Sequence, residues 1–333
     1  MLKISCVSYY LDKVFEGDNL ILLNNLPNDS INLIYCDLLY GTGSNFKDYK
    51  DLKSNYKSFK EFYVDSNRLK LMCDKLKQTG TIALQCDYNY VHYLRLELEN
   101  ILGSKNYRNT IIWNRGSNFN YKSQHFYNCC DFILIFSKSE NYTYNEQYTS
   151  LSDSTIKRYN LKDDNGHYML QSIQSTKNYK KNIDKDIRIF NDEEFINKPN
   201  MGWDWTQETL NSNIKKGYYI VKTYDKKHKL YTLQYKKYLS DSKGKRITNL
   251  WDDIHYINNN DNLNDYSTKK PLELISRIVK SLSNEGDVVA DFFVGSGTTI
   301  ESCLINNRHF IGCDINASAF IRTSNIISKY SSL

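Results

Sequence analysis

Residues 291–299 read Asp-Phe-Phe-Val-Gly-Ser-Gly-Thr-Thr, and they follow the mainly apolar run 287–290. The apolar run predicts a buried strand, and the glycines predict a tight turn into a helix. A second stretch, residues 37–43, reads Asp-Leu-Leu-Tyr-Gly-Thr-Gly and follows a predicted strand at 31–36. Each stretch therefore places an acidic residue and glycines at the carboxyl end of a strand. In an open α/β sheet, ligands bind at that edge.

The segments around these two stretches alternate between helix-like and strand-like patterns. Strands are predicted at 31–36, 81–86, 109–114, 131–137, 287–290 and 309–314. Helices are predicted at 20–26, 59–76, 90–102, 271–283 and 298–306. Such alternation predicts an α/β fold with a mostly parallel sheet and helices on both faces.

The middle of the chain lacks this alternation, because it is polar, tyrosine-rich and built from short segments. We therefore predict one core from residues 1–137 and 251–333, with residues 138–250 as a separate inserted region. Lysines and tyrosines interleave at 213–246 and include Lys215 and Lys216. This pattern suits contacts with phosphates and bases, and it equally suits a solvated lysine-rich face.

The bulk composition narrows the class of protein. The chain has 333 residues, a hydrophobic share of 40% and a net charge of +6, which fit a globular protein with a polyanionic partner. No apolar run reaches the roughly 18 residues of a membrane span, and the start lacks a signal-peptide pattern, so we expect a cytoplasmic location. The eight cysteines form no metal-ligand spacing, so we expect no metal site and no disulfide framework.

The glycine turn excludes two common phosphate-binding motifs. It lacks the Gly-Lys-Ser/Thr of a phosphate loop and the third glycine of a dinucleotide fingerprint. The next predicted strand ends in Asp314, 23 residues after Asp291, where an acid can bind ribose hydroxyls. Asp291 itself can face an amino group. The set suits S-adenosylmethionine, whereas an ordinary strand–helix turn with a surface Asp314 is the alternative.

Both motifs resemble those of the amino-group DNA methyltransferases. Residues 37–40 are similar to the Asp-Pro-Pro-Tyr catalytic motif, and residues 291–299 to the Asp-Pro-Phe-x-Gly-Ser-Gly-Thr-Thr cofactor motif of that family. The catalytic motif comes first, as in the permuted β class. Further similar segments cover nearly the whole chain, at 17–19, 26–31, 86–94, 113–115, 202–206, 250–254 and the Thr-x-Lys-Pro-like 267–271.

This resemblance implies a fold and a reaction. The fold is a Rossmann-like, S-adenosylmethionine-dependent methyltransferase fold, with a mostly parallel seven-stranded sheet and residues 138–250 as a target-recognition region. The reaction is site-specific methylation of the exocyclic N6 of an adenine flipped out of duplex DNA. Aspartate at the start of the catalytic motif favours adenine, while cytosine N4 stays open. The resemblance further implies a cognate restriction endonuclease and a homodimer.

The resemblance also assigns roles to individual residues. Asp37 would accept the amino hydrogens of the base, and Tyr40 would stack on it. The residues implied to bind cofactor are Asp18, Lys269, Asp291, Phe293, Gly295, Ser296, Gly297, Thr298 and Asp314. Those implied to contact DNA are Leu39, Gly41, Thr42, Gly43 and Trp203, and the basic pattern at 213–246 adds Lys215 and Lys216. For Asp18 a turn cap, and for Trp203 a buried core position, are the alternatives.

The chain departs from the family motifs at three prolines, which are replaced by Leu38, Leu39 and Phe292. Proline stiffens a loop, so its loss either reflects a proline-poor chain or weakens catalysis. The second case would give a DNA- or RNA-binding protein without activity on the same fold. The retained acids and glycines favour an active enzyme, and an RNA methyltransferase is a further alternative.

Overall fold

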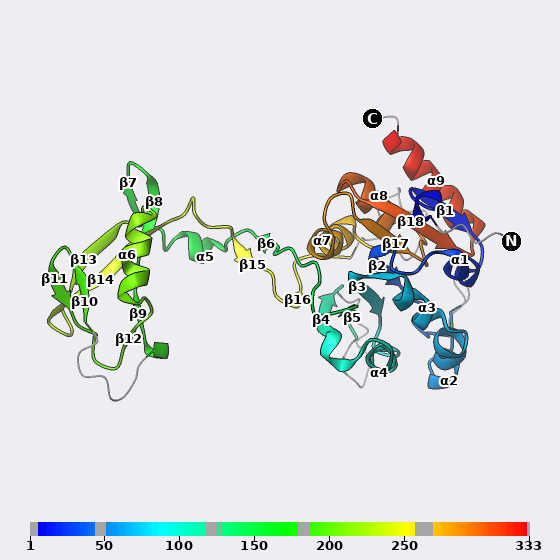
Figure 1. Cartoon of the computed structure of the whole chain (residues 1–333), viewed down its shortest axis with the longest axis horizontal. Coiled ribbons are helices and arrows are strands. Elements are labelled where there is room, and N and C mark those ends of the chain that lie inside the picture. Colours follow the sequence, from blue (N-terminus) through cyan, green and yellow to red (C-terminus); the bar gives the residue numbers. More distant parts are fainter. Residues whose placement is uncertain are drawn as a thin grey trace. The chain divides into compact units, whose positions relative to one another are not determined.

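The computed structural model describes residues 6–43, 51–116, 126, 128–178, 187–256 and 269–331. The chain forms two compact units, the first from Met1–Gln147 with Ile247–Leu333 and the second from Tyr148–Arg246 (Figure 1). These limits differ from the expected 138 and 250 because the flanking residues bond to the first unit. The Lys138 N–H donates to the carbonyl oxygen of Gly80, and the Ile112 N–H to that of Asn249. No helix in the described ranges is long and apolar enough to cross a membrane.

An eight-stranded sheet forms the centre of the first unit. Its order is β1 (Lys13–Glu16), β18 (His309–Asp314), β17 (Val288–Asp291), β2 (Ile31–Asp37), β3 (Leu76–Cys86), β5 (Cys130–Ser137), β4 (Tyr107–Asn114) and β16 (Leu250–Trp251). All neighbours pair in parallel except β5, which is antiparallel to β3 and β4. The mostly parallel sheet predicted from the sequence is confirmed, and the two-residue β16 adds an eighth strand to the expected seven.

Two layers of apolar side chains cover the sheet. Along β2, Ile34 and Cys36 belong to one core cluster, while Leu33 and Tyr35 belong to the other. This alternation follows from the two-residue period of a strand that is buried on both faces. The first cluster includes α1 (Asn19–Asn25), α3 (Arg68–Lys75) and α4 (Val91–Leu102). The second includes α7 (Leu272–Leu282) and α8 (Thr298–Ile305).

The long helix expected at 59–76 is wrong, because the chain breaks there into three short pieces. They are α2 (Tyr56–Phe59), the π-helix η2 (Lys60–Asp65) and α3, after which β3 begins directly. The break before α3 falls at Asn67, whose φ of +62° ends regular helix. Asparagine tolerates this left-handed geometry better than most residues. In the first unit, the elements not expected from the sequence are β1, β16, the 3₁₀-helices η1 (Val7–Tyr9) and η3 (Ser104–Asn106), and α9 (Ala317–Ser331).

The second unit has its own sheet and core. Strands β13 (Ile220–Asp225), β14 (Leu230–Tyr238), β8 (Gly166–Ser172) and β7 (Leu161–Asp163) form an antiparallel sheet beside α6 (Gln207–Lys215). Trp203 is buried in the core of this unit with Leu210 and Leu233, as in the alternative stated above. The shorter elements are β6 (Tyr148–Thr149), α5 (Asp153–Ile156), β9 (Gln174–Ser175), η4 (Thr176–Asn178), β10 (Arg188–Phe190), β11 (Glu193–Phe195), β12 (Gly202–Trp203) and β15 (Lys245–Arg246).

A substitution at Gly312 in β18 would test how tightly the glycine turn packs on the sheet. A Cβ at this position would lie 2.9 Å from Val294 Cγ2 and 3.0 Å from Val14 Cγ2. Because valine side chains are stiff, we expect Gly312→Ala to lower the free energy of unfolding by about 1–3 kcal/mol in urea titrations. The double variant Val294→Ala/Gly312→Ala should lose less than the sum of the two single variants. Full additivity would contradict this packing account.

Candidate active site

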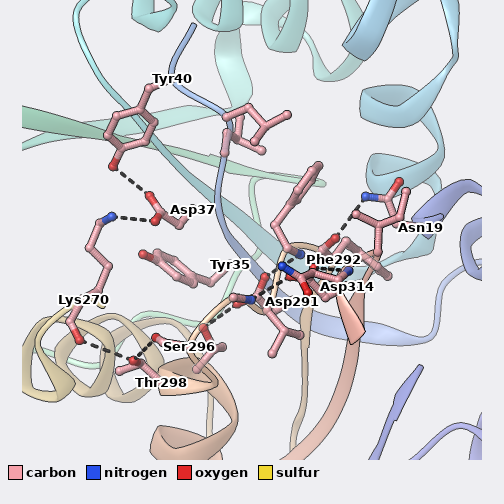
Figure 2. A pocket seen from close by; sticks show the side chains of 18 of the residues that line it. Asn19, Tyr35, Asp37, Tyr40, Lys270, Asp291, Phe292, Ser296, Thr298 and Asp314 are labelled. Carbon is pink, nitrogen blue, oxygen red and sulfur yellow. Dashed lines mark hydrogen bonds and ion pairs between the residues drawn. The ribbon is translucent and has the colours of Figure 1, made fainter. Parts of the chain in front are cut away.

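A cavity of about 1060 Å³ lies in the first unit, at the carboxyl ends of β2, β17 and β18 (Figure 2). Strand β17 pairs in parallel with β2, with Ala290 opposite Ile34, so the two strands end at the same edge. Both motifs therefore border one cavity. The candidate residues that line it are Asp18, Asp37, Leu39, Tyr40, Thr42, Asp291, Phe293, Gly295, Ser296, Thr298 and Asp314.

Asp37 is held from two sides by side chains that Figure 2 shows pointing toward its carboxylate. The Tyr40 hydroxyl lies 2.7 Å from Oδ1, and the Lys270 ammonium lies 2.5 Å from Oδ2. Burial raises the pKa of Asp37, while the contacts with Lys270 and Tyr40 oppose that rise. The ion pair thus favours an ionised carboxylate at the edge of the cavity.

A second carboxylate, Asp131 of β5, reaches the same tyrosine. Its Oδ2 lies 2.8 Å from the Tyr40 hydroxyl and accepts a hydrogen bond from Gln85 Nε2 at 3.0 Å. The Gln85 side chain is fixed in turn by the Tyr35 hydroxyl, which donates to Oε1 at 2.8 Å. Because a hydroxyl has one proton, Asp37 and Asp131 compete for the hydrogen bond from Tyr40.

The two acids beside the glycine turn, Asp291 and Asp314, accept hydrogen bonds from backbone N–H groups, and Asp291 also accepts one from a threonine hydroxyl. Asp314 Oδ2 accepts from the Gly295 N–H at 2.8 Å, and its Oδ1 accepts from the Asn316 N–H at 2.9 Å. Asp291 accepts from the Thr299 hydroxyl at 2.5 Å and from the Phe293 N–H at 2.9 Å. Asp291 is only 2% exposed, and this burial raises its pKa to about 7. Burial also raises the pKa of Asp314.

Hydrogen bonds occupy each position where the family motif has proline. The Leu38 N–H donates to the Gln85 carbonyl at 3.0 Å, and the Leu39 N–H donates to the Tyr63 hydroxyl at 2.9 Å. The Phe292 N–H contacts Cys36 Sγ at 3.3 Å. Proline could make none of these contacts, because it lacks the N–H group. The loops are therefore held by bonds that the substituted residues make available.

Asp18 combines a cap with an ion pair. Its carboxylate caps α1 by accepting from the Leu20 N–H at 2.9 Å. The same carboxylate accepts two bonds from the nearly buried Arg68 guanidinium, at 2.8 and 2.9 Å. Asp18 also borders the cavity. Its geometry is thus that of a structural anchor at the rim of the cavity.

Several candidate residues lie away from the cavity. The described residues that border the cavity do not include Lys269, Gly41, Gly43 or Gly297. They do include Lys270, which follows Lys269 in the chain. The Thr-x-Lys-Pro spacing points to Lys270, because this lysine directly precedes Pro271; residues 267 and 268 lie outside the described ranges. Trp203, Lys215 and Lys216 belong to the second unit.

Gly41 and Gly297 have packing roles. A side chain on Gly41 would collide with the Tyr90 ring, and one on Gly297 would lie 2.8 Å from Ile326 Cδ1. Beside Gly41, the Thr42 N–H and hydroxyl both donate to the buried Asp51. The residues at the cavity that sequence reasoning missed include Tyr35, Asp51, Arg115, Asp131 and Lys270. Within the described ranges, no three His, Cys, Asp or Glu side chains could hold a metal ion.

Comparison with known proteins places this geometry in a family. The type II methyltransferase M.EcaI of Enterobacter cloacae is 26% identical over 90% of this chain and 65% of its own length. The probable type III restriction-modification enzyme HindVI Mod subunit of Haemophilus influenzae is 25% identical over 90% of this chain and 48% of its own length. The chain thus spans about half to two thirds of these relatives.

A solved structure shares the fold. The PvuII DNA methyltransferase, described as cytosine-N4-specific, aligns with 96% of this chain and 90% of its own with a TM-score of 0.53 and 13% identity. The family model described as DNA methylase matches residues 31–324, which include both motifs. The chain therefore belongs to the DNA methylase family.

Proposed function

We propose that this chain is an S-adenosylmethionine-dependent methyltransferase that modifies an exocyclic amino group in duplex DNA, with adenine N6 as its target. The observation that carries the proposal is the shared cavity. Asp37 at the end of β2 and the glycine turn at 295–297 after β17 meet at one edge of the sheet. Membership of the DNA methylase family supports the same reaction.

The residues at the cavity fit the cofactor in charge and in hydrogen bonding. Among the described residues, six acidic side chains and three basic ones border it, and this excess of negative charge suits a sulfonium and an ammonium group. Asp291 would bind the ammonium group. Asp314 would bind the ribose hydroxyls, because each of its oxygens keeps a second lone pair beside its backbone bond. The bound cofactor supplies an electrophilic methyl group.

The chemistry assigned to Asp37 follows from the target. An exocyclic amino group is a weak nucleophile, because its lone pair is delocalised into the ring of the base. Accepting its hydrogens with the Asp37 carboxylate and the adjacent Leu38 carbonyl would localise that lone pair toward the methyl group. Positioning and electrostatic stabilisation supply the rate enhancement. The Tyr40 ring would stack on the flipped base.

The second unit would read the DNA sequence. Residues 148–246 carry 20 lysines and arginines against 12 acids, a net charge of +8, whereas the rest of the chain sums to −2. Lys215 and Lys216 are exposed at the end of α6. Such a concentration of basic residues suits the phosphate backbone. The name of one relative, a restriction-modification Mod subunit, supports a cognate endonuclease as partner. The homodimer and the cytoplasmic location stay part of the proposal.

A binding protein without activity is the second candidate, because three family prolines are missing. The hydrogen bonds at Leu38, Leu39 and Phe292 oppose it, since they hold the loops without proline. Cytosine N4 presents the same amino chemistry and is the alternative base. RNA is the alternative substrate.

The first test is methylation of DNA by the purified chain. We expect N6-methyladenine in duplex DNA incubated with S-adenosylmethionine, measured by mass spectrometry of the nucleosides. Asp37→Ala should reduce the rate by about 10²–10³-fold, because the acceptor for the amino hydrogens is removed. Asp74→Ala on α3, whose carboxylate pairs with Lys70, should keep the native rate.

Three outcomes of that test would change the proposal. If the product were N4-methylcytosine, the target base in the proposal would be cytosine and not adenine. Preference for single-stranded RNA over duplex DNA would replace the substrate. If the well-folded native protein produced no methylated base, the second candidate, a binding protein without activity, would be favoured.

The second test concerns the pH dependence of cofactor binding. The raised pKa of Asp291, about 7, means that the ligand-free protein holds a proton there at mildly acidic pH. Binding an ammonium group requires the ionised form, so binding releases this proton and acid opposes it. We expect the affinity for S-adenosylmethionine to fall by about tenfold for each pH unit below 7 in calorimetric titrations. Asp291→Asn should bind weakly and lose this dependence, whereas a flat native profile from pH 5.5 to 7.5 would refute the assignment.

A further inference from the structure

We propose that Tyr63 is a positioning residue that aims the catalytic loop by anchoring the peptide between Leu38 and Leu39. The inference rests on the proposed function and deepens it, because it says how this chain fixes a loop that lacks the family prolines. The residue lies in η2, and no feature of the two motifs points to it.

The anchor is a hydrogen bond to the backbone. The Leu39 N–H donates to the Tyr63 hydroxyl at 2.9 Å, and the hydroxyl lies 3.5 Å from the Leu39 carbonyl oxygen. The Tyr63 side chain is fully buried. One buried hydroxyl therefore contacts both polar backbone atoms of Leu39.

This bond sets the direction of the neighbouring carbonyl. The Leu39 N–H and the Leu38 carbonyl belong to the same peptide unit, and the described chain has no cis peptide bonds. In a planar trans peptide, N–H and C=O point in opposite directions. Fixing the N–H on Tyr63 therefore turns the Leu38 carbonyl away from Tyr63. That carbonyl is the second acceptor proposed for the amino group of the base.

The anchor is itself held rigidly. The Tyr63 ring packs against Phe59, Phe62 and Tyr90, at centroid distances of 5.3, 4.8 and 6.4 Å. Such an aromatic cluster leaves the ring one position and so one place for its hydroxyl. The π-helical turn of η2 carries Tyr63 into this cluster, and π-turns are often found at functional sites.

The anchor and the leucine depend on each other. A proline at position 39 would fix the loop through its ring and would have no N–H to donate. A leucine there leaves the loop freer and adds an N–H group that needs an acceptor in this partly buried surrounding. Tyr63 supplies that acceptor. The hydrogen bond thus replaces the restraint that the family motif obtains from proline.

The test compares four variants with the native chain in single-turnover methylation at saturating DNA and cofactor. They are Tyr63→Phe, Leu39→Pro, the double variant, and Tyr10→Phe as a matched control. Tyr10 is another buried tyrosine of the same core, and its hydroxyl donates to the Asn25 carbonyl, away from the cavity. Binding of S-adenosylmethionine is measured in parallel.

We expect Tyr63→Phe to slow the methyl-transfer rate by about tenfold, the size of one lost hydrogen bond, with unchanged cofactor affinity. Leu39→Pro should restore the rate of the double variant to near native, because the orphaned N–H disappears and the ring stiffens the loop. Tyr10→Phe should keep the native rate. A native rate for Tyr63→Phe, or a double variant slower than Tyr63→Phe, would overturn the proposal.

Hydrogen exchange separates this inference from the proposed function. The Leu39 amide should exchange faster in Tyr63→Phe than in the native chain and in Tyr10→Phe, whatever the activity. If the native chain is inactive and the exchange still accelerates, the anchor stands while the methyltransferase proposal falls. Unchanged exchange would overturn the anchor even in an active enzyme.

Discussion

The parallel pairing of β17 with β2 is the constraint on which the whole site depends. Only two residue pairs define this register, Val289 with Leu33 and Ala290 with Ile34. They join segments from opposite ends of the chain, and the entire second unit is inserted between them. Because both strands run in the same direction, Asp37 and Asp291 finish at one edge. Without this pairing the chain would hold two unrelated acidic loops.

The edge formed in this way concentrates buried charge. Asp131 and Asp291 are almost fully buried, and Asp37 is partly so. Burying carboxylates is unfavourable unless donors or cations surround them. Each of the three has such partners. The cation beside Asp37 is Lys270, and the cation beside Asp131 is Arg115. Within the described contacts, Asp291 has only neutral donors. A cationic ligand would therefore offset the cost of burying an ionised carboxylate most at Asp291.

Local sequence patterns predict the strands well and the breaks poorly. Strands β2 and β17 are predictable because each is a short apolar run that ends in an acid. The break of the expected helix at 59–76 depends on the backbone of Asn67 and on the packing of Tyr63, which joins a loop 24 residues away. Likewise, Asp131 reaches Tyr40 only through the pairing of β5 with β3. The sequence does separate Lys270 from Lys269, because Lys270 directly precedes Pro271 and so occupies the lysine position of the Thr-x-Lys-Pro spacing.

The point where the chain enters and leaves the second unit has a consequence for its evolution. Strands β6 and β15 pair there, with Thr149 opposite Lys245 and Tyr148 opposite Arg246. One residue further out, the Ile247 N–H donates to the Gln147 carbonyl at 3.1 Å. Both junctions of the insert therefore lie side by side across a short clasp. An inserted unit whose two ends lie side by side can be replaced by another of different length or sequence without a change in the strand register of the eight-stranded sheet.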